Sequence, residues 1–395
     1  MGKGLQNPAR GFNSHPHLMD INNLSKLVDR KRANKEFINL DPLQTGGILT
    51  DQAKKALLEW GDGYSVCDFC QGRLDEIKTP PIYDFVYQIL PEFLGSDCAG
   101  ITNGAREGIY LIMNSVTSPG DYIIIDKSAH YSTYVAAERA KLNIVTVANS
   151  GHPEYLTKTE DYEEVIKETQ KKGKVSLLLI TYPDGSYGNL PNIKKLSNIS
   201  KKYSIPLLIN GAYAIGRMPF NLNEIGADFV TGSGHKSMAS SGPIGVIGYS
   251  KKWEPFINKR SIYYKKKDVE SIGCSARGVT MMTLMASFPE IVKRTNKWSE
   301  QVEKARYFAS EMEKIGINQM GEKPHNHDLM FFESEALYQI SQKHKKGAYF
   351  LYEELKKNKI WGIKPGLTKN FKVSTFAATT EELNTVITVF KNLLF

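Results

Sequence analysis

Asp228-Phe-Val-Thr-Gly-Ser-Gly-His-Lys-Ser-Met-Ala-Ser-Ser-Gly-Pro-Ile-Gly-Val-Ile-Gly-Tyr249 is the stretch from which the fold class of this chain can be inferred. Two apolar runs, each typical of a buried strand, enclose a loop rich in Gly and Ser. Lys236 lies in this loop, directly after His235, with small residues around it. A lysine held between two strands in this way is poorly explained as a solvated surface charge.

The turn Ser233-Gly-His-Lys236, followed by Gly-Pro-x-Gly-Val, resembles that of fold-type I enzymes that use pyridoxal phosphate (PLP). The resemblance implies that Lys236 forms a Schiff base with PLP and that Ser233 and His235 lie near the cofactor phosphate. The alternative is that Lys236 is an ordinary surface-loop lysine.

Length and composition indicate a chain of two domains. At 395 residues it is too long for one simple core. The apolar fraction of 41% and the charged fraction of 24% are those of a globular protein without a membrane segment. No run approaches the roughly 18 apolar residues that span a bilayer, and the N-terminus has no apolar signal region. We therefore expect a cytoplasmic protein that does not enter a membrane.

The net charge and the cysteines indicate which partners and which reactions are possible for this chain. With 51 basic and 42 acidic residues, the net charge of +9 permits a polyanionic partner such as nucleic acid without requiring one. The four cysteines, which we expect to be reduced, are Cys67, Cys70, Cys98 and Cys274. A Cys-x-x-Cys pair in a reducing compartment is more often redox-active or metal-binding than structural.

Apolar strands alternate with helices through the middle of the chain. The predicted strands are 122–126, 144–147, 177–181, 207–210, 229–231 and 245–249, and predicted helices include 82–94, 105 onward, 133–141, 159–171 and 193–202. This alternation predicts an α/β fold with a mainly parallel, buried sheet.

We divide the chain into an N-terminal arm with the cysteine pair (1–75), a large PLP-binding domain (76–289) and a small α+β domain (290–395). The arm is expected to contain short helices at 21–28 and 51–60, and 39–47 is a turn-rich approach to the site. The small domain is expected to begin with a long helix at 290–315 and to contain a helix at 348–357, a strand at 371–375 and a last helix from 381.

Three further groups suit a PLP site. Asn103-Gly-Ala-Arg106 enters a helix, and a helix N-terminus binds anions well. His130 follows a strand, where ligands lie in open α/β sheets, and an imidazole can stack on the pyridine ring. Asn210 ends the strand that usually supplies an aspartate to the ring nitrogen, and it cannot hold that nitrogen protonated as an anion would. Asp184 is the nearby acidic alternative.

Aminotransferases of this fold bind the substrate carboxylate with an arginine of the C-terminal domain. This chain has no arginine after Arg306, and Lys369 and Lys372 are poor geometric substitutes. Either the carboxylate is bound from elsewhere, or the substrate has none. An amino acid esterified to tRNA has no free carboxylate.

With Lys236, His130, Asn210 and Cys67-x-x-Cys70, the chain resembles the O-phosphoseryl-tRNA:cysteinyl-tRNA synthase family from about residue 40 to the C-terminus. This family makes cysteine on tRNA in archaea, from phosphoserine already attached to tRNA(Cys). Its members are PLP-dependent homodimers with the site between subunits. The resemblance implies the same substrate, and a transient complex with the synthetase that makes phosphoseryl-tRNA.

The resemblance also assigns roles to residues. Those that would contact PLP are Ala105, Arg106, His130, Asn210, Ser233, Gly234 and His235. Lys236, the Schiff-base lysine, would then remove the Cα proton, and phosphate would leave from Cβ to give dehydroalanyl-tRNA, to which sulfur adds. Candidates for holding the leaving phosphate are Arg106, His130 and Arg277.

The cysteines Cys67, Cys70 and Cys274 match the family's sulfur-handling thiols. Cys67 and Cys70 could pass a persulfide by exchange, with Cys274 as the acceptor or resolving thiol. Alternatively the three could bind an iron–sulfur cluster, although such clusters usually take four ligands. Inert or structural thiols are the third interpretation, and the sulfur donor is not indicated by the sequence.

Three other functions are compatible with parts of the sequence. A cysteine desulfurase or related lyase shares the His-Lys turn, but its mobile cysteine lies in or near the C-terminal domain, and this chain has no cysteine after Cys274. A PLP decarboxylase would not explain the cysteine pair. A non-catalytic tRNA-binding scaffold would not explain an intact Lys236.

Overall fold

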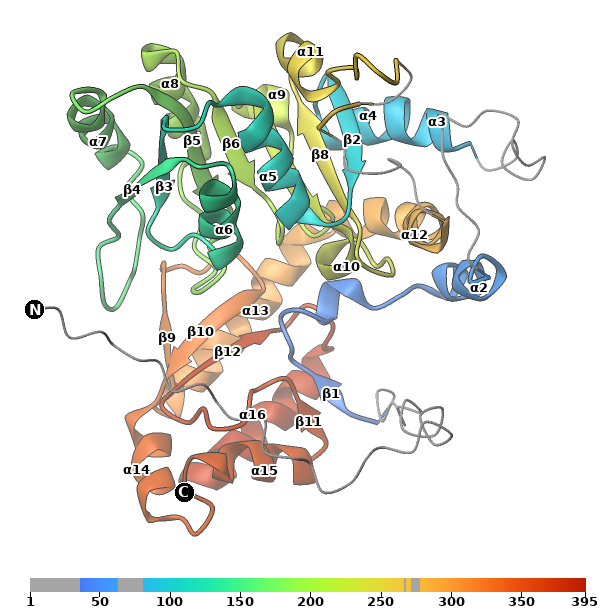
Figure 1. Ribbon diagram of the computed structural model, residues 1–395. Coiled ribbons are helices and arrows are strands. Elements are labelled where there is room, and N and C mark those ends of the chain that lie inside the picture. Colours follow the sequence, from blue (N-terminus) through green and yellow to red (C-terminus); the bar gives the residue numbers. More distant parts are fainter. Residues whose placement is uncertain (1–35, 63–80, 266–267, 271–277) are drawn as a thin grey trace, which may run out of the picture. The chain divides into compact units, whose positions relative to one another are not determined.

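The computed structural model describes residues 36–62, 81–265, 268–270 and 278–395. Residues Ile38–Phe395 form one compact unit, which is drawn as a ribbon in Figure 1. The described residues begin at Glu36, so the helix expected at 21–28 lies outside them.

A seven-stranded sheet carries the polar turn of Lys236. Its order is β2-β8-β7-β6-β5-β3-β4. The strands are β2 (Cys98–Thr102), β3 (Tyr122–Asp126), β4 (Asn143–Val147), β5 (Val175–Thr181), β6 (Leu207–Asn210), β7 (Phe229–Ser233) and β8 (Gly245–Tyr249). β4, β3, β5, β6 and β7 are parallel, whereas β8 is antiparallel to β7 and β2 is antiparallel to β8. The predicted mainly parallel α/β sheet is confirmed.

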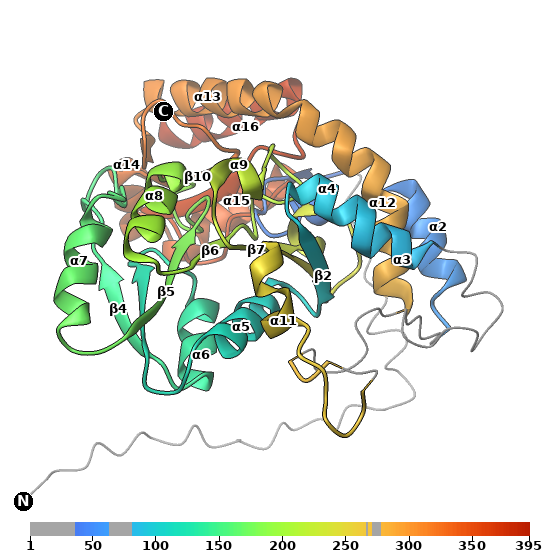
Figure 2. The ribbon, with the colours of Figure 1, turned by 90° about the horizontal axis from the view of Figure 1, so that it is seen from above.

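Both faces of this sheet are buried, which gives three layers (Figures 1 and 2). Alternate residues of β3 divide between the faces: Ile123 and Ile125 join one core cluster and Ile124 the other. The first face is covered by α5 (Ala105–Val116), α6 (Tyr131–Arg139) and α11 (Glu254–Ile257), and the second by α3 (Ile82–Asp84), the π-turn η5 (Phe85–Ile89), α4 (Leu90–Leu94), α7 (Asp161–Gln170), α8 (Ile193–Tyr203), α9 (Leu222–Ile225) and α12 (Gly278–Asn296).

A second core is built on a three-stranded antiparallel sheet of order β12-β10-β9. Its elements are α13 (Trp298–Lys314), β9 (Asn318–Met320), β10 (Leu329–Glu333), α14 (Glu335–Lys343), η7 (Gly347–Tyr349), α15 (Phe350–Lys357), β12 (Asn370–Ser374) and α16 (Thr380–Leu394). The side chains of Thr379 and Glu382 form a capping box that begins α16. The division of the chain at residue 290 stays a prediction.

Two expectations about elements were wrong. The stretch before Ala105 contains β2, which was not among the predicted strands. The helix expected at 290–315 is two helices that meet at Lys297, whose backbone leaves the helical region (φ −101°, ψ 23°). The break has a packing reason, because Met281 and Ile291 of α12 pack in the large core whereas Ala305 and Phe308 of α13 pack in the second.

The first described segment joins the second core to the lysine turn. β1 (Ile38–Asn39) pairs in parallel with β11 (Ile360–Trp361), and Leu40 is buried in the second core. The short helix η3 (Thr45–Gly47) then contacts α10 (Gly234–Ser237), the single turn that carries Lys236. After it, α2 (Asp51–Glu59) packs on α12.

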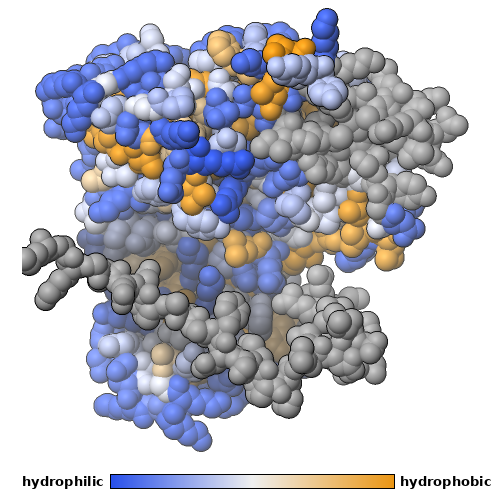
Figure 3. Space-filling model, in the orientation of Figure 1, coloured by the Kyte–Doolittle hydropathy of each residue, from blue (hydrophilic) through white to orange (hydrophobic). Residues whose placement is uncertain are grey.

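The surface is mostly polar on the face drawn in Figure 3, where apolar residues form scattered patches among hydrophilic ones. Within residues 36–62, 81–265, 268–270 and 278–395, no helix is long and apolar enough to cross a membrane.

Candidate functional site

Lys236 lies in α10, a four-residue helix that begins directly after β7. The ammonium nitrogen Nζ lies 5.0 Å from the centroid of the Tyr213 ring. Burial, and then the positive charge of Arg217, lower the pKa of Lys236 below its ordinary value. A larger share of this amine is therefore uncharged near neutral pH than for an exposed lysine, which suits an amine that attacks a carbonyl carbon or accepts a proton.

Glycines bring the N-terminus of α5 onto the lysine turn. Gly104, at φ +105°, is the residue before α5, and no side chain caps that helix. A Cβ added to Gly245 would lie 2.5 Å from the carbonyl carbon of Gly104, and one added to Gly104 would lie 3.6 Å from Cε1 of His235. Any side chain at Gly245 would therefore push the start of α5 away. The helix N-terminus, a good anion site, lies next to His235.

Two buried polar atoms beside this N-terminus have no hydrogen-bond partner among the described residues. They are the Ser233 hydroxyl oxygen Oγ, at the end of β7, and the His235 ring nitrogen Nδ1. An unpaired buried polar group costs about 1–3 kcal/mol, so such atoms are expected where a ligand completes the site. A lysine of lowered pKa, an open helix N-terminus and these atoms together fit the aldehyde and the phosphate of PLP.

His130 is the N-cap residue of α6, and its Nδ1 lies 2.8 Å from the Ser132 hydroxyl. Burial lowers the pKa of His130 to about 4, and the positive charges of Lys236, Lys372 and Arg106 contribute in that order. These influences place His130 in the same positive surrounding as the lysine. At neutral pH the ring is uncharged, so it can stack or donate one N–H but supplies no ionic attraction to a phosphate.

We expect His130 to stay neutral between pH 5 and pH 8 in the protein without ligands. Its folded pKa is lowered, so protonation occurs only as the pH falls toward about 4. The ring ¹⁵N shifts of His130, followed by NMR and assigned by their loss in His130→Gln, would not change over this range. A titration midpoint near 6.5 would contradict the arrangement.

The two candidates for the pyridine nitrogen differ in their present contacts. Asn210 ends β6, is buried, and its side-chain oxygen accepts a long 3.4 Å bond from the Ala212 amide. Asp184 is engaged by its own loop, because its carboxylate accepts the backbone N–H groups of Ser186, Tyr187 and Asn189 at 2.7–3.0 Å. Asn210 is therefore the freer of the two.

Asp126 is a buried carboxylate that was not among the predicted site residues. It ends β3 and accepts the Thr181 amide at 2.8 Å, while its Oδ2 has no partner among the described residues. Burial raises the pKa of Asp126 to about 7. Its place at a strand's carboxyl end was the available signal, since that edge of an open α/β sheet carries the ligand.

Lys372 was judged a poor substitute for a carboxylate-binding arginine, yet its ammonium lies near the site. Its Nζ donates to the Gly185 carbonyl, in the loop after β5. Burial lowers the pKa of Lys372, while Asp184 raises it and Lys236 lowers it. Lys369 instead pairs with Glu335 at 3.1 Å.

Four of the predicted site residues lie outside the described residues: the three cysteines assigned to sulfur transfer, Cys67, Cys70 and Cys274, and the phosphate candidate Arg277. Their assigned roles, including that of iron–sulfur ligands, stay predictions. Cys98, which begins β2, is free and half-buried, and burial raises the pKa of its thiol. Within the part of the chain that the structure describes, no group of three or more His, Cys, Asp or Glu side chains could hold a metal ion.

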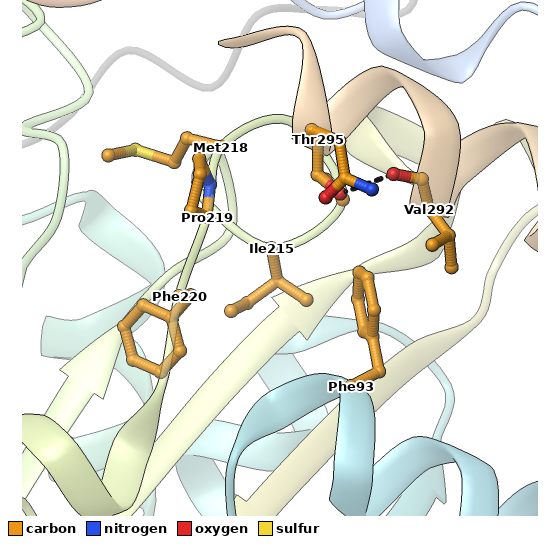
Figure 4. A pocket seen from close by; sticks show the side chains of 9 residues that line it. Phe93, Ile215, Met218, Pro219, Phe220, Val292 and Thr295 are labelled. Carbon is orange, nitrogen blue, oxygen red and sulfur yellow. Dashed lines mark hydrogen bonds between the residues drawn. The ribbon is translucent and has the colours of Figure 1, made fainter.

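A cavity of about 190 Å³ lies between α4, the loop after β6 and the end of α12. Figure 4 shows the apolar side chains of Phe93, Ile215, Phe220 and Val292 around it. None of the predicted site residues lines this cavity. This cavity is therefore separate from the binding site that the chemistry of Lys236 and His130 indicates.

The family model of O-phosphoseryl-tRNA(Sec) selenium transferase, SepSecS, matches residues 61–394. The chain is similar to O-phospho-L-seryl-tRNA:Cys-tRNA synthases of Methanosarcina acetivorans, at 56% identity over 95% of this chain and 98% of the relative, and of Methanocaldococcus jannaschii, at 48% over 91% and 96%.

Solved structures show the same relationship. A crystal structure of a SepCysS–SepCysE N-terminal domain complex is 46% identical, with a TM-score of 0.88 over 94% of this chain and 98% of that chain. A cysteine desulfurase from Thermococcus onnurineus NA1 has a TM-score of 0.74 over 92% of this chain and 96% of that chain, at 16% identity. The second likeness shows the fold alone, that of fold-type I PLP enzymes.

Proposed function

Because this chain belongs to the O-phospho-L-seryl-tRNA:Cys-tRNA synthase family, we propose that it converts phosphoserine on tRNA(Cys) to cysteine by replacing the phosphate at Cβ with sulfur. The observation that carries the proposal is the Lys236 turn, in which an amine of lowered pKa adjoins a helix N-terminus and two unpartnered polar atoms. With sulfide as the donor, one hydrogen sulfide replaces one hydrogen phosphate, so the exchange balances without an oxidant or reductant.

The residues proposed to hold PLP are Lys236, which would bind its aldehyde carbon, and groups around the phosphate and ring: Ala105, Arg106, His130, Asn210, Ser233, Gly234 and His235. When bound, PLP supplies an electron sink for the charge that develops at Cα. Asn210 offers the ring an amide rather than an anion. An ester substrate compensates, because an ester stabilises negative charge at Cα better than a carboxylate does.

The chain's own groups then move the protons and hold the phosphate. The Lys236 amine takes the proton from Cα of the phosphoseryl group, which an uncharged amine can do. Arg106, in the first turn of α5, and the N–H of neutral His130 are proposed to bind the phosphate as it leaves Cβ, with Arg277 as a third candidate. Sulfide then adds to Cβ directly. Where Cys67, Cys70 or Cys274 carries the sulfur as a persulfide, its outer sulfur adds to Cβ and a second of these thiols breaks the S–S bond to release cysteinyl-tRNA. The cysteine disulfide that this leaves is then reduced by an external thiol.

The partners follow the same reasoning. A relative was crystallised with the N-terminal domain of SepCysE, and we propose that this chain binds a partner of that kind. A homodimer with the site between subunits, a transient complex with phosphoseryl-tRNA synthetase, and a cytoplasmic location belong to the proposal. The net charge of +9 is compatible with tRNA.

One assay tests the function. The protein is supplied with PLP, phosphoseryl-tRNA(Cys) and sulfide, the ester is hydrolysed, and the released amino acid and phosphate are quantified. Cysteine and phosphate in equal amounts are expected. In a parallel reaction with free cysteine in place of the tRNA substrate, formation of alanine would indicate a desulfurase instead. Binding of tRNA without any turnover would indicate a scaffold.

A further inference from the structure

Arg217, in the loop after β6, is a fully buried arginine that contacts the turn of Lys236. Its Nη2 donates to the Lys236 carbonyl oxygen at 3.3 Å and its Nε to the Ser237 hydroxyl at 3.2 Å. On its other side, Nη1 lies 2.7 Å from Oδ2 of Asp328, and Nη2 lies 2.9 Å from the Pro42 carbonyl oxygen. One side chain thus joins the lysine turn to the second core and to the segment before η3.

Arg294, on α12, reaches the same turn from a different element. Its Nε donates to the Gly216 carbonyl oxygen at 2.9 Å, and its Nη2 donates to the carbonyl oxygens of Gly46, at 3.1 Å, and of Ser237. The Phe376 ring contacts both guanidinium groups, with its centroid 5.1 Å from Cζ of Arg217 and 5.2 Å from Cζ of Arg294.

The backbone of Gly46 and Gly47 also packs closely against the lysine turn. A Cβ added to Gly46 would lie 2.6 Å from the Lys236 carbonyl oxygen, and one added to Gly47 would lie 2.0 Å from that of His235. The Ala239 amide also donates to the Gly46 carbonyl oxygen at 3.1 Å. Only a backbone without side chains can lie this near the turn.

The two arginines supply what a four-residue helix lacks. The last carbonyl groups of a helix have no partner within it, and cations are favourable there. Charge-assisted bonds from two guanidinium groups are stronger than neutral ones and fix the carbonyl oxygens in place. Among the described residues, Asp328 is within salt-bridge distance of Arg217, and no carboxylate is within that distance of Arg294. Arg217 and Arg294, which together we call the arginine clamp, therefore keep a net positive charge below the lysine.

We propose that Arg217 and Arg294 are positioning residues for Lys236: their buried guanidinium groups hold the carbonyl end of its turn and so fix where its amine can reach. The inference rests on the proposed role of Lys236 as the lysine that binds PLP. Neither arginine contacts the amine itself, and neither is assigned a step of the reaction.

The charges that face Lys236 come from several elements. Arg217 follows β6, Lys372 lies on β12, and His130 precedes α6 with Arg106 near it. Tyr213 lies under the amine, and burial raises the pKa of its hydroxyl to about 12, so it is uncharged at neutral pH. Because Arg217 lowers the pKa of Lys236, a substitution that keeps its charge tests position separately from charge.

The experiment compares Arg294→Met, Arg294→Lys and Arg217→Lys with wild type, each at least 15 °C below its own Tm. The control is Arg306→Met on α13, whose guanidinium donates to the His325 carbonyl oxygen at 2.7 Å, away from the lysine turn. Three quantities are measured: the apparent Kd for PLP, the fraction of Lys236 linked to PLP after borohydride reduction, by peptide mass, and kcat with KM.

We expect Arg294→Met to weaken PLP binding about 10-fold and to lower kcat about 30- to 100-fold, because displacing a reacting group by about 1 Å costs on that order. KM for the tRNA substrate should change less than about threefold, and Arg294→Lys should recover part of kcat. Arg217→Lys keeps Asp328 paired, so it should fold and still lower kcat. Arg306→Met should match wild type in all three quantities.

A lower Tm for Arg294→Met, with kcat and the linked fraction of Lys236 within twofold of wild type, would overturn the proposal and reduce the clamp to a stabilising contact. If Arg294→Met does not fold, Arg294→Lys and Arg217→Lys decide by the same criterion. If wild-type Lys236 is not linked to PLP at all, the proposed function itself fails, and this inference with it.

Discussion

Replacing Lys236 with alanine is expected to lower kcat by at least about 10³-fold and to abolish the absorbance band of the lysine–PLP Schiff base. The turn offers this one amine next to the α5 N-terminus, and a positioned general base contributes about 10²- to 10⁴-fold to a rate. Arginine at this position should be equally inactive, because it keeps a positive charge but has no amine of low pKa. The band and single-turnover cysteine formation on tRNA measure the effect.

The matched control is Lys304→Ala. Lys304 is also a half-buried lysine whose pKa is lowered by burial, and its Nζ donates to the Ala378 carbonyl oxygen at 2.7 Å. Lys304 lies on α13, a helix of the second core, so replacing it should leave the Schiff-base absorbance band in place. A Schiff-base band that survives in Lys236→Ala would refute the central assignment.

Replacing Asp328 with asparagine should lower the free energy of unfolding by about 3–5 kcal/mol, because it leaves the buried Arg217 without its carboxylate. Both side chains are fully buried, and the Ser374 hydroxyl also donates to the carboxylate. Urea unfolding measures the change. The control is Glu290→Gln, which removes an exposed ion pair with Lys293 (2.8 Å) and should cost less than about 1 kcal/mol.

The stability lost in Asp328→Asn should become smaller as the pH falls into the acid range. Burial alone would raise the pKa of Asp328, but Arg217, then His327 and the Ser374 hydroxyl, lower it below its ordinary value. A carboxyl with a lowered folded pKa contributes stability that is complete above its unfolded pKa, about 4, and disappears as the pH falls through the folded value. The difference between wild type and Asp328→Asn should be constant from pH 8 to pH 5 and narrow below about pH 4. A difference that vanished already at pH 6 would contradict it.

Together these predictions separate two parts of one site. Lys236 performs chemistry, and its loss should remove activity with little effect on folding. Asp328 maintains structure through Arg217, and its loss should be visible first in unfolding. Arg294 has an intermediate role: it holds the turn, but it has no buried carboxylate partner within the described residues.

The strands of the large sheet were predictable because each is a short apolar run between polar segments. β3, β6 and β8 begin and end at the predicted residues. β2 was missed because Cys98–Thr102 has only one large apolar side chain, that of Ile101, and therefore lacks the apolar run that marks the other strands. The break at Lys297 was missed because the apolar pattern continues on both sides, and only the choice of core differs.

By itself, the sequence determined the lysine turn, six of the seven strands of the large sheet, and the candidate residues at strand ends and at the start of α5. These depend on periodicity, on glycine and on neighbours a few residues away, all of which can be read along the chain. Only the tertiary structure identified the arginine clamp. Its contacts join Arg217 to Asp328 and to Pro42 across 111 and 175 residues, and Arg294 to Gly46 across 248. Residues this far apart along the chain leave no local sequence pattern, because only folding brings them into contact. Once buried, a charged side chain that loses its partner strongly destabilises the fold, so these contacts matter more than surface ion pairs.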